Sequence, residues 1–378
     1  MQFLEAVSRS PSVSWYRLLG EHQGEVNRWV ASTPESIRIC NCPELCGVEF
    51  SNALRTAMTS VIATAPFAPL LRECRPDRIT VMNFLRGSLN FDVRSALYDA
   101  LGVNLHATCF MSSQRFRKDG RWHVKEDMYR KIRIPEDAVL LFADVVATGV
   151  TVDNGLEVIQ QHVVDGKASL TAAVFFTIGC HKIEKILEKY HAEFKKLFPG
   201  YRETHVVYLE AKLRLVDSQT KLVIAIPGTD LVKQDALLSP EFEASQYATL
   251  SAPLERCAIY DAGSRAFDVV EYLSDVVEYW ESVRRLARRG YTLFEALLER
   301  WPERHHASRA AFMEVKTREW AGVSKDFYGR VWDAYKERWT PKFKLWAQSR
   351  ESLECVCEDR LKVLHKLMEQ MGRQHEHD

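Results

Sequence analysis

The sequence predicts an α/β protein in which a central, mostly parallel sheet is followed by an all-α region. Three observations support this prediction. Short apolar segments alternate with helical patterns between residues 78 and 228, as in strand–helix–strand units. An apolar run at residues 139–142 ends at one acid, Asp144, and a turn of small residues then leads into a helical pattern. From residue 267 onward the pattern is helical, and glycine and proline become sparse.

The elements of the first region follow from periodicity and turn residues. Residues 52–63 predict a helix that Pro66 ends, and residues 78–84 predict a strand. A helix at residues 91–101 is closed by Gly102. Further strands are expected at residues 105–111, 139–142, 170–178, 204–209 and 221–226, with helices after residue 151 and at residues 183–197. Strands that alternate with helices imply a parallel sheet covered on both faces.

Composition predicts a cytoplasmic protein of more than one domain. We expect an N-terminal extension at residues 1–50, an α/β domain at 51–239 and a helical domain at 240–378. The formal net charge is zero, which argues against a global basic field for nucleic acids but leaves local patches open. No apolar run reaches membrane-spanning length, and the first residues show no signal-peptide core. The nine cysteines are expected to be thiols.

The stretch from Asp144 to Thr151 has the features of a phosphate site. A buried strand, a tight loop and a helix N-terminus together offer unpaired backbone N–H groups to an anion. The alternative is an ordinary strand–helix turn in which Thr148 or Thr151 caps the helix.

This stretch resembles the 5-phosphoribosyl-1-pyrophosphate (PRPP) signature of the type I phosphoribosyltransferases, nearest to the uracil and orotate types. The resemblance covers about residues 78–180 and implies a Rossmann-like type I phosphoribosyltransferase fold. It implies that Asp144, as the second acid of the family's pair, meets the ribose hydroxyls. The family's first acid is replaced by Ala143. The loop implied to hold the 5-phosphate consists of Ala147, Thr148, Gly149, Val150 and Thr151.

A second loop lies at the position where members of this family bind pyrophosphate. It follows the strand at residues 78–84 and consists of Leu85, Arg86, Gly87 and Ser88. Gly87 permits close backbone approach, and Arg86 offers a planar fork suited to phosphate oxygens. The alternative is a generic turn with Arg86 in a salt bridge. The resemblance also implies Mg²⁺, which would bind together with PRPP, with Asp144 as the candidate protein contact.

The basic segment at residues 113–133 corresponds to the flexible hood that closes over the reacting centre in the family. Its candidate residues are Arg115, Arg117, Lys118, Arg121 and Lys125. A solvated hairpin and a nucleic-acid contact are the alternatives. Gly179 and His181 are the candidate residues on the acceptor side, although His181 also fits a surface position at a helix start.

The resemblance implies a pentosyl-transferring glycosyltransferase that moves phosphoribose from PRPP to a nitrogen acceptor and releases pyrophosphate. Ala143 supports an alternative, a regulator that keeps the nucleotide pocket and loses turnover. A third possibility is a toxin-like effector of a bacterial defence system, such as a retron, whose helical domain binds a protein or nucleic-acid partner. Many members of the family dimerise, so we expect a homodimer.

Two further groups of residues have less specific patterns. The cysteines Cys40, Cys42 and Cys46 lack the paired spacing of common zinc sites, so a metal is the less favoured interpretation. Six tryptophans lie in the helical region, and we expect them to pack a core rather than form a binding surface. They are Trp280, Trp301, Trp320, Trp332, Trp339 and Trp346.

Overall fold

The computed structural model describes most of the chain. The described residues are 2–20, 24–85, 87–118, 121–166, 168–217, 220, 222–224, 230–256, 268–300, 306 and 308–374. For residues 113–118, 121–128 and 372–374 the backbone alone is described.

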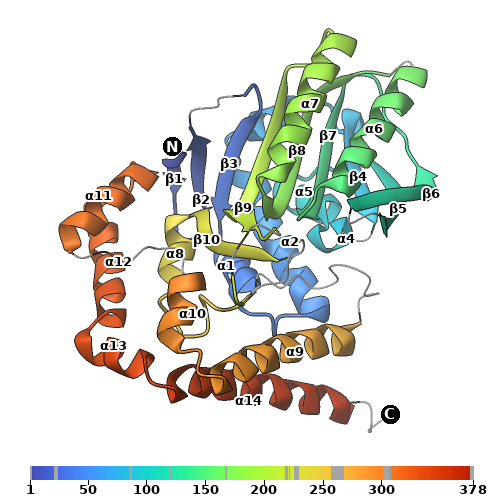
Figure 1. Ribbon diagram of the computed structural model, residues 1–378. Helices are drawn as coiled ribbons and strands as arrows, with labels where there is room; N and C mark the ends of the chain where they lie inside the picture. The colour runs from blue at the N-terminus through green and yellow to red at the C-terminus, as the bar shows by residue number, and fades with distance from the viewer. Residues whose placement is uncertain are drawn as a thin grey trace.

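A large sheet forms the centre of the molecule (Figure 1). Its strands are β1 (Phe3–Arg9), β2 (Ser14–Leu19), β3 (Asn27–Ser32), β4 (Ile79–Leu85), β5 (Ala107–Lys118), β6 (Arg121–Lys131), β7 (Ala138–Val146), β8 (Leu170–Cys180), β9 (Glu203–Leu215), β10 (Leu231–Leu238) and β11 (Trp320–Ala321). The order is β11-β1-β2-β3-β9-β8-β7-β4-β5-β6, and β10 pairs with β9. All neighbours from β3 to β5 in this order are parallel, whereas β1–β2, β2–β3, β5–β6 and β9–β10 are antiparallel pairs. The predicted central, mostly parallel sheet is therefore confirmed.

Helices cover both faces of the sheet, as the alternation of side chains along β7 requires. Val139 and Leu141 join the apolar cluster that holds α2 and α5 side chains. Leu140 and Phe142 join the cluster that holds α6 and α7 side chains. The helices of this region are α1 (Pro34–Asn41), α2 (Gly47–Thr64), α3 (Ala68–Glu73), α4 (Ser88–Phe91), α5 (Val93–Leu101), α6 (Val150–Asp165), α7 (Lys182–Leu197) and α8 (Pro240–Ser245).

The strand order reverses between β4 and β7. From β4 the chain passes through α5 to β5 on one side, and from β7 it passes through α6 to β8 on the other side. The five strands β5-β4-β7-β8-β9 thus repeat the doubly wound order 2-1-3-4-5.

The first 50 residues, in which the sequence showed little pattern, add β1, β2 and β3 to the sheet. The prediction of a strand at residues 221–226 is wrong for residues 222–224, which are the described part of this range and form no strand. The next strand, β10, comes later in the chain.

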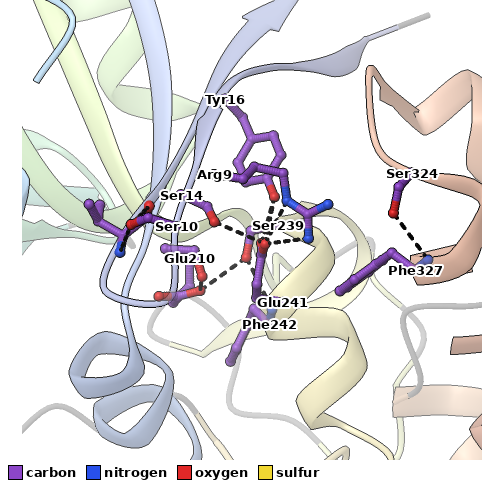
Figure 2. Close-up of polar contacts among 12 residues, drawn as sticks. Arg9, Ser10, Ser14, Tyr16, Glu210, Ser239, Glu241, Phe242, Ser324 and Phe327 are labelled. Atoms are coloured by element: carbon purple, nitrogen blue, oxygen red, sulfur yellow. Dashed lines mark hydrogen bonds and ion pairs between the residues drawn. The ribbon is translucent and has the colours of Figure 1, made fainter. Parts of the chain in front are cut away.

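Hydrogen bonds and an ion pair connect the N-terminal strands β1 and β2 to α8 (Figure 2). Glu241 accepts hydrogen bonds from Arg9 Nη2 at 2.8 Å and from Tyr16 Oη at 2.7 Å. Glu210 lies in a left-handed backbone conformation, with φ of +66°, and accepts a hydrogen bond from Ser239 Oγ at 3.0 Å. These contacts hold the N-terminal end of α8 against β1, β2 and β9.

The helical region contains α9 (Val269–Arg288), α10 (Leu293–Arg300), α11 (Arg309–Glu319), α12 (Lys325–Arg338), α13 (Pro341–Ala347) and α14 (Glu351–Gln374). The predicted helical C-terminal region is confirmed, and Figure 1 shows α9 and α14 running side by side. Trp280 and Trp320 are buried in its packing, as expected, whereas Trp301 lies outside the described residues. Side chains of α9 and α14 share one apolar cluster with α1 and α2. The domain boundary at residue 239 stays a prediction.

No helix within the described ranges is both long enough and apolar enough to span a bilayer.

Candidate functional site

The two loops predicted to bind a phosphorylated ligand meet at the point where the strand order reverses. They follow β4 and β7, which are parallel neighbours, so both emerge at the same edge of the sheet. A Cβ atom placed on Gly87 would lie only 2.6 Å from Oδ1 of Asp144. The backbone of the first loop therefore lies against the carboxylate of the second. In open α/β sheets, ligands bind beyond the carboxyl ends of the strands at this reversal point.

Asp144 is held at the end of β7 with little freedom. Its side chain is 9% exposed, and Oδ1 accepts a hydrogen bond from the backbone N–H of Val145 at 2.8 Å. The neighbouring strand places Thr177 beside it in register. A carboxylate fixed in this way at a strand end can accept hydrogen bonds from ligand hydroxyl groups.

The loop after β7 leads directly into the N-terminus of α6. Gly149 is the N-cap residue, with φ of +80°, and a Cβ atom there would lie 2.5 Å from Ile186 Cδ1. The positive φ favours glycine at this position, and a larger residue would also displace the end of the Ile186 side chain. No side chain caps the helix, so the alternative in which Thr148 or Thr151 is the cap is wrong. The first N–H groups of α6 have no intrahelical acceptor and are available to an anion.

Thr148 carries a polar atom that the protein itself leaves unsatisfied. Its Oγ1 is buried and has no hydrogen-bond partner among the described residues. A buried hydroxyl without a partner costs about 1–3 kcal/mol. A phosphate oxygen bound at the α6 N-terminus would remove this cost.

Two contacts fix the loop and the helix in place. Sγ of Cys180 donates a hydrogen bond to the carbonyl of Ala147 at 3.1 Å, and burial raises the pKa of this thiol, which keeps it a donor. A Cβ atom on Gly155 would lie 2.2 Å from Phe84, so α6 can approach β4 closely only because residue 155 is glycine. The N-terminus of α6 is thereby held over the junction of the two loops.

Other predicted residues have different placements. Arg86 lies outside the described residues. Leu85 ends β4, and Ser88 is buried and donates a hydrogen bond to the carbonyl of Phe84 at 2.6 Å, so it supports the loop. Gly179 pairs with Val146 at the end of β8.

His181 is exposed at the start of α7, as its alternative interpretation expected. Partial burial, and then the charge of Lys182, lower the pKa of His181. Both effects favour the neutral form of the ring, which can accept a proton.

The predicted hood is a hairpin of β5 and β6, whose register runs from Phe110 opposite Lys131 to Lys118 opposite Arg121. The side chains of its candidate cations, Arg115, Arg117, Lys118, Arg121 and Lys125, lie outside the described residues.

A cavity of about 350 Å³ lies between Arg130 at the base of β6 and His162 in the last turns of α6. It is at the opposite end of α6 from the loop and does not belong to the site.

Sequence reasoning missed Thr177 and Asn90. Thr177 is fully buried beside Asp144, and its Oγ1 has no hydrogen-bond partner in the described part of the chain. Asn90 accepts a hydrogen bond from Ser51 at 3.0 Å, which ties α2 to the short helix after Gly87. A polar residue inside an apolar run was the signal for both, but it does not say which neighbour the residue faces.

The described residues contain no group of three or more His, Cys, Asp or Glu side chains placed to hold a metal ion. Burial raises the pKa of Cys42, and raises that of Cys46 to about 11, so both remain thiols at neutral pH. At the candidate site the donor set is one carboxylate, Asp144. This set fits Mg²⁺, which is commonly held by one or two carboxylates together with phosphate oxygens of a substrate.

Solved structures similar to this chain include the AQ2163 protein of Aquifex aeolicus, with 13% identity over 47% of this chain and 84% of that one, and a TM-score of 0.34. A hypoxanthine-guanine phosphoribosyltransferase of Bacillus anthracis aligns with 18% identity over 34% and 68% of the two chains, with a TM-score of 0.24. The corresponding enzyme of L. donovani aligns with 12% identity over 43% and 82%, with a TM-score of 0.26. No family model matches the sequence, and no curated protein matches it. Because each of these TM-scores is below 0.5, no argument below depends on these similarities.

Proposed function

We propose that this protein binds PRPP with Mg²⁺ at the junction of the β4 and β7 loops and transfers the phosphoribosyl group to a nitrogen acceptor, releasing pyrophosphate. One observation carries the proposal: the backbone of Gly87 lies against the carboxylate of Asp144, beside an uncapped helix N-terminus. Three features thus lie side by side: an anion site at the N-terminus of α6, a carboxylate that can bind hydroxyl groups, and a glycine whose backbone a ligand can approach closely. A sugar bearing phosphates at both ends is a ligand that uses all three.

Each group then has a distinct part in binding. The 5-phosphate lies at the N-terminus of α6, where backbone N–H groups and Thr148 Oγ1 bind its oxygens. Asp144 accepts hydrogen bonds from the ribose hydroxyls. The pyrophosphate lies over Gly87. Asp144 would hold Mg²⁺, which would supply positive charge to stabilise the leaving pyrophosphate. The cationic hairpin β5–β6 closes over this end of the ligand and excludes water.

A second candidate function is a nucleotide-binding regulator with little turnover, and Ala143 favours it. The side chain of Ala143 is fully buried, in the apolar cluster that includes α2 and α5. The family to which the sequence is similar has an acid here, whereas this chain surrounds the position with hydrocarbon. A single carboxylate therefore remains to position the ribose.

Calorimetry with PRPP and MgCl₂ tests the binding step. We expect Asp144→Ala and Thr148→Ala to weaken PRPP binding by about tenfold or more, because each removes a group worth roughly 1–3 kcal/mol to a charged ligand. The control is Asp165→Ala, an exposed acid at the far end of the same helix. Unchanged affinity in both site variants would refute the assignment. If the protein binds PRPP, an assay of pyrophosphate release with a panel of bases separates a transferase from a regulator.

A further inference from the structure

A buried ion cluster lies at the first turn of α7. Glu184, in that turn, is only 12% exposed and accepts hydrogen bonds from Lys212 Nζ at 3.0 Å and from Tyr208 Oη at 3.3 Å. Arg28 Nη1 lies 3.8 Å from the same carboxylate. Lys212 Nζ also donates a hydrogen bond to Oε1 of Gln2 at 2.7 Å. Side chains from β3, from β9 and from the residue before β1 therefore meet at one carboxylate of α7.

The backbone of β9 is distorted next to this cluster. Thr177 of β8 pairs with Tyr208, but Gly179, two residues later, pairs with Lys212. The strand β9 therefore bulges by two residues, and Glu210 within the bulge has a φ of +66°. In regular pairing Glu210 would lie opposite Gly179, so the bulge is what brings Lys212 level with the end of β8, where α7 begins. Bulges and strained residues of this kind are concentrated near functional sites, where they redirect side chains.

The same part of α7 supports the loop between β7 and α6. Cδ1 of Ile186, two residues after Glu184, packs against the backbone of Gly149, since a Cβ atom placed on Gly149 would lie 2.5 Å from it. Cys180, just before α7, donates a hydrogen bond from Sγ to the carbonyl of Ala147 at 3.1 Å. A shift of the first turn of α7 would therefore move both contacts that hold this loop.

We propose that Glu184 is a positioning residue of the PRPP site: bound by Arg28 and Lys212, it fixes the first turn of α7, and α7 fixes the loop that binds the 5-phosphate. A buried ion pair adds little net stability compared with apolar residues of the same size, so its contribution here is a defined geometry. Because Arg28 lies in β3, a strand outside the doubly wound set completes the site. The proposal rests on the proposed function, which identifies PRPP as the ligand.

Glu184→Gln tests the proposal, because it removes the charge that Lys212 and Arg28 hold. We expect PRPP affinity to fall by about tenfold in calorimetry with MgCl₂, since a displacement of about 1 Å in a positioning group costs up to about a hundredfold. A second measurement needs no ligand. The backbone N–H of Asp153 donates to the carbonyl of Gly149 at 2.9 Å and should lose protection against hydrogen exchange in the variant.

The matched control is Glu243→Gln. It breaks another buried ion pair, in which Lys316 Nζ of α11 donates to Glu243 of α8 at 2.8 Å and both side chains are 3% exposed. Glu184→Gln and Glu243→Gln should both lower the urea concentration at the midpoint of unfolding. The control should change neither PRPP affinity nor exchange at Asp153, which separates positioning of the loop from a general loss of stability.

Ile186→Val tests the last contact by itself. It removes Cδ1, the atom that packs against Gly149, and should weaken PRPP binding by about threefold, the order of magnitude expected for one buried methyl group. Ile159→Val is its control, because it removes the same atom from a fully buried isoleucine in the middle of α6 and should leave the affinity unchanged.

Two results would overturn the proposal. The first is wild-type PRPP affinity together with unchanged exchange at Asp153 in Glu184→Gln. The second is a loss of affinity in Glu243→Gln as large as that in Glu184→Gln. If the wild-type chain does not bind PRPP, the proposed function fails, and hydrogen exchange at Asp153 alone then decides whether Glu184 positions the loop.

Discussion

Replacing Gly87 by alanine tests the contact between the two loops most directly. The backbone at Gly87 has φ of −53° and ψ of −36°, which alanine adopts without strain. Any effect must then come from the added Cβ atom, which would lie 2.6 Å from Asp144 Oδ1, whereas ordinary contact begins at 3.4 Å. The carboxylate has to retreat by about 0.8 Å, and its hydrogen bond from the N–H of Val145 has to lengthen or break. Displacements of this size in a positioning group typically reduce function by about tenfold to a hundredfold.

We expect Gly87→Ala to lower PRPP affinity by at least tenfold in calorimetry with MgCl₂. Its free energy of unfolding should stay within about 1 kcal/mol of the wild-type value, because alanine restricts the unfolded chain. Gly200→Ala is the matched control, since no atom lies within 4 Å of a Cβ placed there. Wild-type affinity in Gly87→Ala would refute the reasoning, because the two loops would then not share a ligand.

Further predictions concern single side chains. Thr148→Val should leave the unbound protein as stable or more stable by about 1 kcal/mol, since it removes an unsatisfied hydroxyl, and should weaken PRPP binding; equal affinity would contradict the loop assignment. Burial raises the pKa of Glu210 to about 7 from 4.5, against hydrogen bonds from hydroxyl groups that lower it. Because the folded state then binds more protons than the unfolded state, the free energy of unfolding should fall as the pH rises from about 4.5 to 7. Urea titrations at several pH values should show that the free energy of unfolding of Glu210→Gln depends less on pH than that of the wild type. Burial also raises the pKa of Glu255 to about 7, so we assign any remaining pH dependence to Glu255. Arg360→Ala should lower the free energy of unfolding by about 3–5 kcal/mol, because it leaves buried Glu255 without its ion-pair partner; Arg318→Ala, in an exposed pair, should change it by less than about 0.5 kcal/mol.

The sequence was most informative where local patterns determine structure. The apolar run into Asp144 predicted β7 and α6, and Gly149 predicted the turn between them, because strand, turn and helix signals are all local. The strands β4, β5, β8 and β9 were predicted within a few residues of their starts for the same reason. The strands within residues 1–50 were not predicted. The strand β3, for example, is buried almost throughout but begins with Asn27 and Arg28, so it lacks the apolar run that identified β7 and β8.

What the sequence could not show were contacts between distant segments. Nothing local predicts that Gly87 lies against Asp144, because that contact depends on which strands become neighbours. The same holds for β11, which comes from the helical region and pairs with β1 at the edge of the sheet. Equally, the expectation that tryptophans pack a core is met by Trp280 but not by Trp346, since helical periodicity does not show which faces remain uncovered.

The helical region is attached to the candidate site through a continuous series of contacts. Arg360 of α14 pairs with Glu44, immediately before α2. The first turns of α2 then bind the short helix after Gly87, through Ser51 and Asn90. The apolar cluster that includes α9 and α14 also includes β7 side chains, so the region packs as part of the sheet's covering layer. A change at Arg360 is therefore expected to reach the candidate site. Arg360→Ala should weaken PRPP binding in calorimetry with MgCl₂, and unchanged affinity would show that these contacts do not transmit the change.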